Sequence, residues 1–365
     1  MALQLRRKTH ESVVYIDKDS APRIMPFGED FILEDIPIGT RVIYPNPPIQ
    51  GLPNREAAIR YAINHPLDAK PLYAQLEPGM KITIAMDDIS LPLPPMATPD
   101  LRQTMLEVVL DLCYANGVDD IHLIIANSLH RKMTEWEMKR MVGSKIHNAF
   151  YPERYYNHDA EDDDNLVTLG YTRHNEPLRI NRRAAESDIL IYLNINLVPM
   201  DGGHKSVAVG LRDYESLRAH HEPQTIRDSH SYMDPPASEL NHKVTRLGKL
   251  VDEHCNVFHI ETALNNKMFS DGFDILTRNE DDFTFADRMK WEAMSRTFSK
   301  MPRAARRKML HAIPAQYDMI ACFAGETELV HDKILEKNYQ QYEIPVKGQC
   351  DILISGIPDI SPYNV

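Results

Sequence analysis

Short apolar runs that favour β-strands alternate along this chain with longer segments that have helical spacing. The apolar runs cover residues 81–86, 120–126 and 188–193, and helical segments cover 100–115 and the stretch from 134 to 141. Within 100–115, the apolar residues that share one helical face are Leu101, Met105, Val108, Val109 and Leu112. A repeat of strand, loop and helix is typical of a parallel α/β sheet, because parallel strands need a crossover between them.

The length of 365 residues suggests two domains. We expect an N-terminal α/β domain over residues 1–265, with a parallel, Rossmann-like sheet. Residues 266–315 are charged and helix-prone, which predicts a helical insertion or linker. Residues 316–365 would begin a second α/β domain that is incomplete or short, and residues 351–355 have the pattern of a buried strand.

Composition and charge exclude several classes of function. The chain has 41 Lys and Arg against 53 Asp and Glu, a net charge of −12, which argues against a nucleic-acid partner. No apolar run reaches the ~18–20 residues of a membrane span, and the first residues lack the apolar stretch of a signal peptide. The four cysteines form no Cys-x-x-Cys pair, so neither a zinc knuckle nor a disulfide framework is expected. The expected protein is cytoplasmic, with no membrane contact.

Three loops follow the predicted strands, at residues 87–95, 127–132 and 194–210. Ligands of parallel sheets collect at the carboxyl ends of strands, so these loops are where a site is expected. The third loop contains Gly202-Gly-His-Lys-Ser206. Two glycines allow a backbone to approach a ligand closely, and a lysine there can pair with an anion or act as a nucleophile. A surface turn with an exposed lysine is the simpler alternative, and the chain has neither a P-loop nor a G-x-G-x-x-G turn.

Histidines also fall in or near these loops. His130 directly follows the second strand, and His220 and His221 follow a helical segment at 214–219. A lone histidine is often structural, and a histidine pair is often an exposed helix end. Metal binding by the pair is the functional alternative, although the chain has no H-E-x-x-H spacing.

The region from Asp188 to His221 resembles the nickel-pincer lactate racemase family, in which a strand, a loop, a Gly-Gly-Arg-Lys-Ser-Val stretch and a helix ending in histidine follow in this order. The other blocks that agree in order are Asn64–Leu67 with Ile84–Pro94, Ala126–Arg131, Asn157–Asp159 with Leu169-Gly170, Cys322–Gly325 and Cys350–Ile354. The likeness runs from about residue 55 to the end, with residues 270–312 as an insertion.

The resemblance implies that residues 1–265 bind a cofactor, a nickel-pincer nucleotide attached covalently through Lys205. Gly202, Gly203 and Ser206 would shape its site, and His221 would be the protein ligand to nickel.

The implied reaction is that of an isomerase, a racemase or epimerase that inverts the C2 centre of a 2-hydroxy acid by hydride transfer to the cofactor. His130 would be a general base on the substrate hydroxyl, and Asp88 would lie near the cofactor or His130. His204, where the family has arginine, is a candidate second base. The implied partners are a small hydroxy acid and the enzymes that make the cofactor.

Two departures from the family pattern bear on the substrate. Leu91 stands where the family has an arginine that binds substrate carboxylate, so we expect a hydroxy acid other than lactate. The loop after the third strand is about four residues shorter and offers Asn194, Asn196 and Asp201 instead of a second histidine. One alternative is a cofactor-binding homologue without racemase activity. The other is a zinc-dependent hydrolase using His130, His220 and His221, which would leave Lys205 unmodified.

Overall fold

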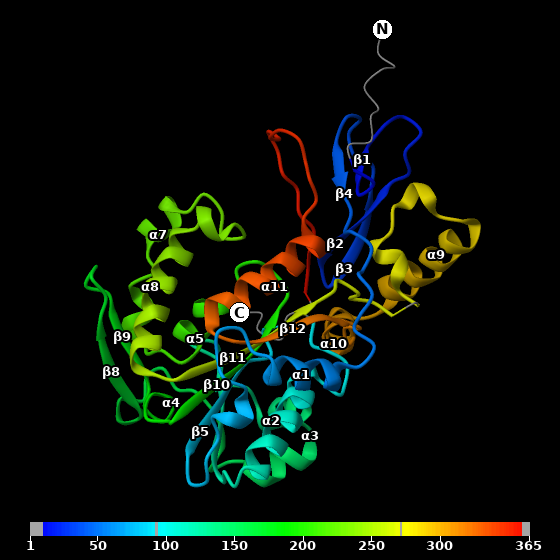
Figure 1. Ribbon diagram of the computed structural model, residues 1–365. Coiled ribbons are helices and arrows are strands. Elements are labelled where there is room, and N and C mark those ends of the chain that lie inside the picture. Colours follow the sequence, from blue (N-terminus) through cyan, green and yellow to red (C-terminus); the bar gives the residue numbers. More distant parts are fainter. Residues whose placement is uncertain (1–9, 92–93, 271, 360–365) are drawn as a thin grey trace.

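A six-stranded sheet forms the centre of the computed structural model, which describes residues 10–91, 94–270 and 272–359 (Figure 1). Its strand order is β12–β11–β10–β5–β6–β7. The strands are β5 (Lys81–Asp87), β6 (Asp120–Ala126), β7 (Tyr155–Asn157), β10 (Ile189–Asn196), β11 (Val257–Leu264) and β12 (Met319–Gly325). All neighbours pair in parallel except β12, which runs antiparallel to β11. The predicted α/β class with a parallel sheet is confirmed.

Helices cover both faces of this sheet. On one face lie α1 (Arg55–Asn64), α2 (Leu101–Ala115) and α3 (Glu135–Phe150); on the other lie α5 (Gly203–Gly210), α8 (Glu239–His254) and α11 (Thr327–Tyr342). A capping box formed by Thr134 and Glu137 starts α3. Asp100 caps α2, and Gly117 follows its end at φ +74°.

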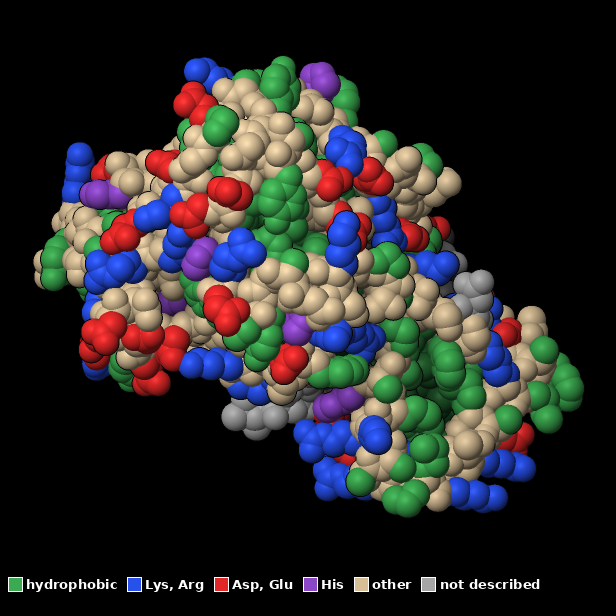
Figure 2. All heavy atoms as spheres, turned by 90° about the horizontal axis from the view of Figure 1, so that it is seen from below, with side chains coloured by type: hydrophobic (Ala, Val, Ile, Leu, Met, Phe, Trp, Pro, Cys, Tyr) green, Lys and Arg blue, Asp and Glu red, His purple; other side chains and the backbone are tan. Residues whose placement is uncertain are grey.

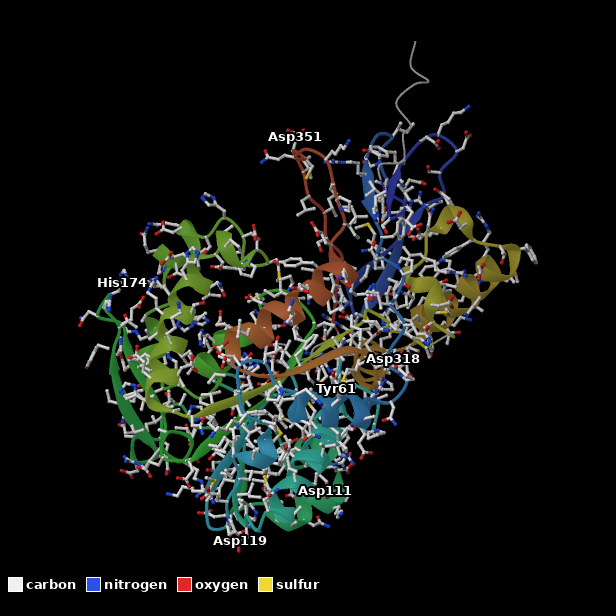
Figure 3. The ribbon with its side chains drawn as sticks, viewed as in Figure 1. Tyr61, Asp111, Asp119, His174, Asp318 and Asp351 are labelled. Carbon is white, nitrogen blue, oxygen red and sulfur yellow. The ribbon has the colours of Figure 1, made fainter. Side chains whose placement is uncertain are left out.

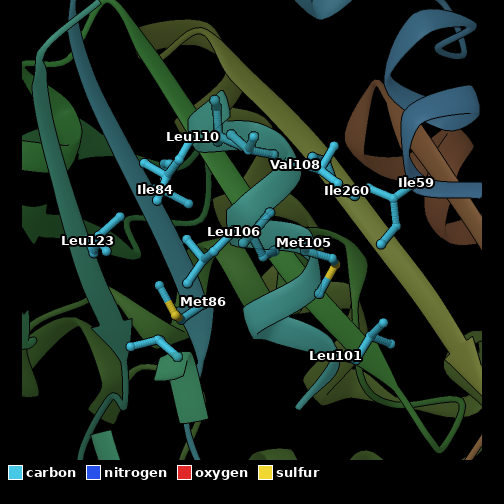
Figure 4. Close-up of a cluster of buried hydrophobic side chains, with 14 of the residues drawn as sticks. Ile59, Ile84, Met86, Leu101, Met105, Leu106, Val108, Leu110, Leu123 and Ile260 are labelled. Carbon is cyan, nitrogen blue, oxygen red and sulfur yellow. The ribbon is translucent and has the colours of Figure 1, made fainter. Parts of the chain in front are cut away.

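Successive side chains of a strand point to opposite faces of the sheet, and this alternation decides which helices each side chain packs against. Ile84 and Met86 of β5 face α2, where they meet Leu106 (Figure 4). Each such aliphatic side chain contributes about 1.5–3 kcal/mol when fully buried. The same alternation directs Ala85 toward α5 on the opposite face, and Asp87 lies two residues beyond it at the end of the strand.

The remaining elements flank the central sheet. A hairpin of β8 (Leu166–Tyr171) and β9 (Pro177–Asn181) has His174 at its tip (Figure 3). Near the N-terminus, β1 (Val13–Tyr15) pairs with β4 (Arg41–Ile43), and β2 (Arg23–Gly28) pairs with β3 (Asp30–Glu34) and β13 (Ile357–Pro358). The short elements are α4 (Arg182–Ala185), α6 (Tyr214–Arg218), α7 (Pro223–Asp228) and 3-10 turns at Leu72–Ala74, Asp163–Asn165, Pro235–Ala237, Asp274–Thr277 and Glu280–Asp282.

The helix-prone segment contains α9 (Phe285–Lys300) and α10 (Arg303–Ala312), as expected. Phe298 of α9 packs edge-on against Phe31 of β3, with ring centroids 5.8 Å apart.

Seen from below, charges of both signs are interspersed on the surface, and hydrophobic side chains gather toward the right of the view (Figure 2). No described helix has the length and apolar character needed to cross a membrane.

The C-terminal part differs from expectation in two ways. β12, in the segment expected to begin a second domain, is instead the edge strand of the central sheet. The predicted buried strand at 351–355 is wrong: these residues form no strand, and Ile352 and Leu353 are 78% and 82% exposed. Asp351 lies at the tip of a long loop, where no described strand pairs with this run (Figure 3). The bounds 1–265 and 266–315 stay predictions, and residues 360–365 of the last segment lie outside the described part.

Candidate functional site

The carboxyl ends of three neighbouring parallel strands meet at one edge of the sheet. β5 ends at Asp87 and leads to Asp88, β6 leads to Asn127 and His130, and β10 ends with Asn194 and Asn196. Because these strands are adjacent and parallel, the loops predicted to carry a site do lie together.

Asp88 and His130 form a hydrogen-bonded pair, with 2.7 Å between Asp88 Oδ2 and His130 Nδ1. The Asp88 carboxylate is buried, and the His130 side chain is 51% exposed. Burial raises the pKa of Asp88, but the hydrogen bonds and charge of His130, together with Ser90, outweigh burial and lower it. An ionised Asp88 favours the tautomer of His130 that carries its proton on Nδ1, which leaves Nε2 as the basic nitrogen.

A buried arginine holds the backbone that carries Asp88. Arg102, at the start of α2, is 1% exposed, and its Nη1 donates to the carbonyl oxygens of Asp87 (2.9 Å), Asp88 (2.6 Å) and Leu91 (2.9 Å). Its Nε and Nη2 donate to the Asp100 carboxylate at 2.9 and 2.7 Å. Arg102 was not among the residues predicted from the sequence, where its one signal is a charged residue next to the apolar face of a helix.

Lys205 lies in the first turn of α5 with its amine directed to Asp201, at 3.1 Å between Nζ and Oδ1. Burial disfavours the charged amine, but the charges of Asp201, Asp87 and Asp88 outweigh burial and raise the pKa of Lys205. Lys205 is therefore within electrostatic reach of the Asp88–His130 pair.

Asp87 lies beneath this group, fully enclosed at the end of β5. Its carboxylate accepts hydrogen bonds from the Asn194 amide (2.7 Å), the Ile195 backbone N–H (2.8 Å) and the Tyr192 hydroxyl (3.1 Å). Burial is the main reason that the pKa of Asp87 is raised to about 7, although the Ile195 hydrogen bond and the charges of Arg102 and Lys205 lower it. Asp87 also escaped the sequence analysis, which selected its neighbour.

The two adjacent histidines after α6 have different surroundings. His220 is buried, its Nδ1 lies 3.3 Å from Arg212 Nη1, and burial together with the charge of Arg212 lowers its pKa to about 2. His221 is exposed, and its pKa is lowered chiefly by burial of part of its ring and then by the charges of Arg212, Lys205 and His130. His221 thus shares its electrostatic surroundings with Lys205 and His130, and its neutral imidazole is the form that binds metal ions.

Gly202, Gly203 and Ser206 shape the turn that precedes Lys205. Gly202 and Gly203 have φ values of +98° and +55°, which favour glycine. The Ser206 hydroxyl accepts from the Gly202 backbone N–H (3.1 Å) and from the Asn194 amide (2.9 Å). These three residues support the backbone of the turn.

His204 points away from this group. Its buried ring has Nε2 2.5 Å from Asp252 of α8 and Nδ1 2.9 Å from Glu328 of α11. Burial lowers the pKa of His204, but the hydrogen bond to Asp252 and the charges of Asp252 and Glu328 outweigh burial and raise it to about 9. The structure therefore places His204 in an ion cluster between helices, where it does not support the expected role of second base.

His204, Asp252 and Glu326 make up the only group of three or more potential metal-ligand residues with converging atoms in the described part of the chain. A histidine that is protonated between two carboxylates has no lone pair left for a metal. His130, His220 and His221 do not form such a group among the described residues, so the geometry does not favour the zinc hydrolase alternative.

Comparisons with known proteins show the family to which the chain is similar. The family model described as "Lactate racemase N-terminal domain" matches residues 28–234. The lactate racemase of Thermoanaerobacterium thermosaccharolyticum is 25% identical over 183 residues, 49% of this chain and 41% of that protein. The lactate racemase of Lactiplantibacillus plantarum is 25% identical over 178 residues, 47% of this chain and 40% of that protein. The matched part is thus less than half the length of these curated relatives.

Solved structures give the same fold. The lactate racemase apoprotein from Thermoanaerobacterium thermosaccharolyticum matches with a TM-score of 0.55 and 20% identity, over 87% of this chain and 62% of that one. A Thermotoga maritima protein matches with a TM-score of 0.52 and 13% identity, over 80% and 60% of the two chains. Since the family model covers more than half of its length, the chain belongs to the lactate racemase N-terminal domain family.

Proposed function

We propose that this protein is a racemase or epimerase that inverts the C2 centre of a 2-hydroxy acid other than lactate, with a nickel-pincer nucleotide attached to Lys205. The observation that supports it most is the grouping of Lys205, His221 and the Asp88–His130 pair at one edge of a parallel sheet. Membership of a family that includes lactate racemases makes racemase-type chemistry the first expectation.

The donor set of the site fits such a cofactor. Lys205 supplies a primary amine for a covalent link, and 24% of its side chain is exposed. His221 supplies an imidazole whose lowered pKa keeps it neutral and able to coordinate nickel. When bound, the nucleotide supplies the acceptor and donor of hydride for the substrate C2 atom.

His130 and Asp88 then handle the proton of the substrate hydroxyl. His130 Nε2 accepts this proton as C2 is oxidised and returns it when the alcohol forms again. Asp88 holds the ring through Nδ1 and stabilises the imidazolium that forms during each turnover. Arg102 keeps Asp88 in place by binding three carbonyl oxygens of its loop.

The charges around the site support a substrate other than lactate. Leu91 provides no charge for a substrate carboxylate, and nearby cationic side chains already have carboxylate partners. Arg102 pairs with Asp100, Arg131 with Glu137 and Lys132 with Asp159.

Mass spectrometry of the protein co-produced with nickel and the cofactor-synthesis enzymes tests the proposal. We expect a covalent adduct on the peptide that contains Lys205. Lys205→Ala should abolish this adduct, whereas Lys249→Ala, at an exposed position of α8, should retain it. His130→Ala should retain the adduct but lose turnover in a screen of hydroxy acids. An unmodified Lys205 in the presence of available cofactor would contradict the proposal.

A cofactor-binding protein without racemase activity is the second candidate. Leu91 and the position of His204, away from the Asp88–His130 pair, favour it, because a racemase needs to bind its substrate and serve both enantiomers. An adduct on Lys205 without inversion of any hydroxy acid in the screen would support this candidate instead.

A further inference from the structure

A fully buried carboxylate lies directly against the turn that precedes Lys205. Glu261, on β11, is 0% exposed and accepts four hydrogen bonds. Its Oε1 accepts from His331 Nδ1 (3.0 Å) and the Asn196 amide (3.1 Å), and its Oε2 accepts from His259 Nε2 (3.1 Å) and the Gly203 backbone N–H (3.2 Å). The carboxylate therefore joins β10, β11, α11 and the first residue of α5.

The two glycines of the turn fit against this carboxylate and the His331 ring. A Cβ atom at Gly202 would lie 2.1 Å from Glu261 Oε1, and one at Gly203 would lie 2.8 Å from the His331 ring. Real Cβ atoms do not approach other atoms so closely. The absence of side chains at both positions is thus required by Glu261 and His331 as well as by the backbone angles.

Two histidines keep Glu261 charged inside the protein. Burial raises the pKa of Glu261, but the charge of His331 and the hydrogen bonds from His259 and His331 outweigh it and lower the pKa to about 2. The pKa of His331 is raised in turn, because the charge of Glu261 outweighs the burial of the ring. An anion is also favourable at the N-terminus of α5, where backbone N–H groups point toward it.

We propose that Glu261, held by His331 and His259, is the positioning residue that fixes the Gly202–Gly203 turn and thereby keeps the Lys205 amine beside Asp201. Asp201 immediately precedes Gly202, and its backbone carbonyl accepts from the same Asn196 amide (2.6 Å) that donates to Glu261. The position of Asp201 therefore depends on the same hydrogen-bond network. Glu261 and His331 both lie outside residues 28–234, so the match to the family does not include this support. Its importance for cofactor attachment rests on the function proposed above.

The pH dependence of Lys205 acylation tests this assignment. The full chain, made without cofactor-synthesis enzymes, would be treated with acetic anhydride at a series of pH values, and each lysine peptide quantified by mass spectrometry. In the unmodified sequence we expect the amine of Lys205 to react only at higher pH than that of Lys249, because three carboxylates favour its charged form.

Glu261→Gln should lower the midpoint of Lys205 acylation by about one pH unit, which is about a tenfold faster reaction at a fixed pH below the midpoint. Lys249, in the same sample, should not change. His331→Gln, which keeps the carboxylate and replaces a charged donor with an uncharged side chain, should shift the midpoint in the same direction by a smaller amount. It serves as the test if Glu261→Gln does not fold, which circular dichroism will show.

An unchanged midpoint for Lys205 in either folded variant would overturn the assignment. Because the assay needs no nucleotide, this result is independent of whether Lys205 carries a cofactor. A shifted midpoint in a protein that never gains an adduct would support the role of Glu261 and contradict the proposed function.

Discussion

Replacement of His204 by glutamine should remove a pH-dependent part of the stability of this protein. His204 is 2% exposed and lies between Asp252 and Glu328, which joins α5 to α8 and α11. Glutamine is close in size, is never charged and leaves the two carboxylates in place. The substitution therefore isolates the contribution of the imidazolium charge.

The magnitude follows from the change in pKa. Burial lowers the pKa of His204, but the hydrogen bond to Asp252 and the ion pair with Glu328 outweigh burial, so that the pKa rises from 6.5 to about 9 on folding. At about 1.36 kcal/mol per unit, this shift corresponds to roughly 3 kcal/mol. A raised pKa means that the folded state binds the proton more tightly. The stabilisation is therefore fully present below pH 6.5 and is lost as the pH rises to about 9.

Urea denaturation at pH 6 and at pH 9.5 measures this effect. The difference in the free energy of unfolding between the natural sequence and His204→Gln should be about 3 kcal/mol larger at pH 6 than at pH 9.5. His254→Gln, at an exposed histidine of α8, is the matched control for replacing a histidine by glutamine. If the free energy of unfolding depends on pH in the same way in the natural sequence and in His204→Gln, the reasoning is refuted. That result would mean that His204 is not charged in the folded protein.

Three further substitutions address the site and its support. Asp88→Asn should slow turnover at least ~100-fold with little change in the thermal midpoint of unfolding, because an amide no longer selects the correct tautomer of His130. Chiral chromatography of the product measures the rate. Arg102→Met should cost about 3–5 kcal/mol in chemical denaturation, since it leaves Asp100 charged, buried and unpaired, and a loss below ~1 kcal/mol would contradict the pairing. Gly210→Ala should cost about 1–3 kcal/mol by thermal unfolding, because its Cβ would lie 2.6 Å from that of Ala126.

Local patterns were enough to predict the sheet and the sheet edge where the candidate site residues meet. Strands such as β5 and β6 are mostly apolar, and a polar residue directly after such a run marks the strand end. His130 and Asp88 could be selected on that basis, aided by the resemblance to a family. Their mutual hydrogen bond could not be predicted, since it depends on how two loops fold.

The absence of a strand at residues 351–355 and the orientation of His204 have a different physical origin. The Ile352–Ile354 run has the composition of a buried strand, but a strand also needs a neighbour with which to pair, and sequence alone does not show one. His204 occupies the position next to Lys205, yet successive residues of a helix point in directions about 100° apart. One of the two side chains therefore faces Asp201 at the sheet edge, and the other faces α8 and α11.

The surroundings of Lys205 come from both sides of the boundary at residue 234 where the family match ends. Asp87, Asp88 and Asp201 raise the pKa of its amine and lie within the match. Glu261 of β11 and His331 of α11, which we propose fix the Gly202–Gly203 turn, lie beyond the family match. Because Gly203 donates to Glu261, a chain ending at residue 234 would leave the start of α5 without this partner. The residues that we propose to react therefore lie in the matched region, whereas their placement depends on a later strand and helix of this chain.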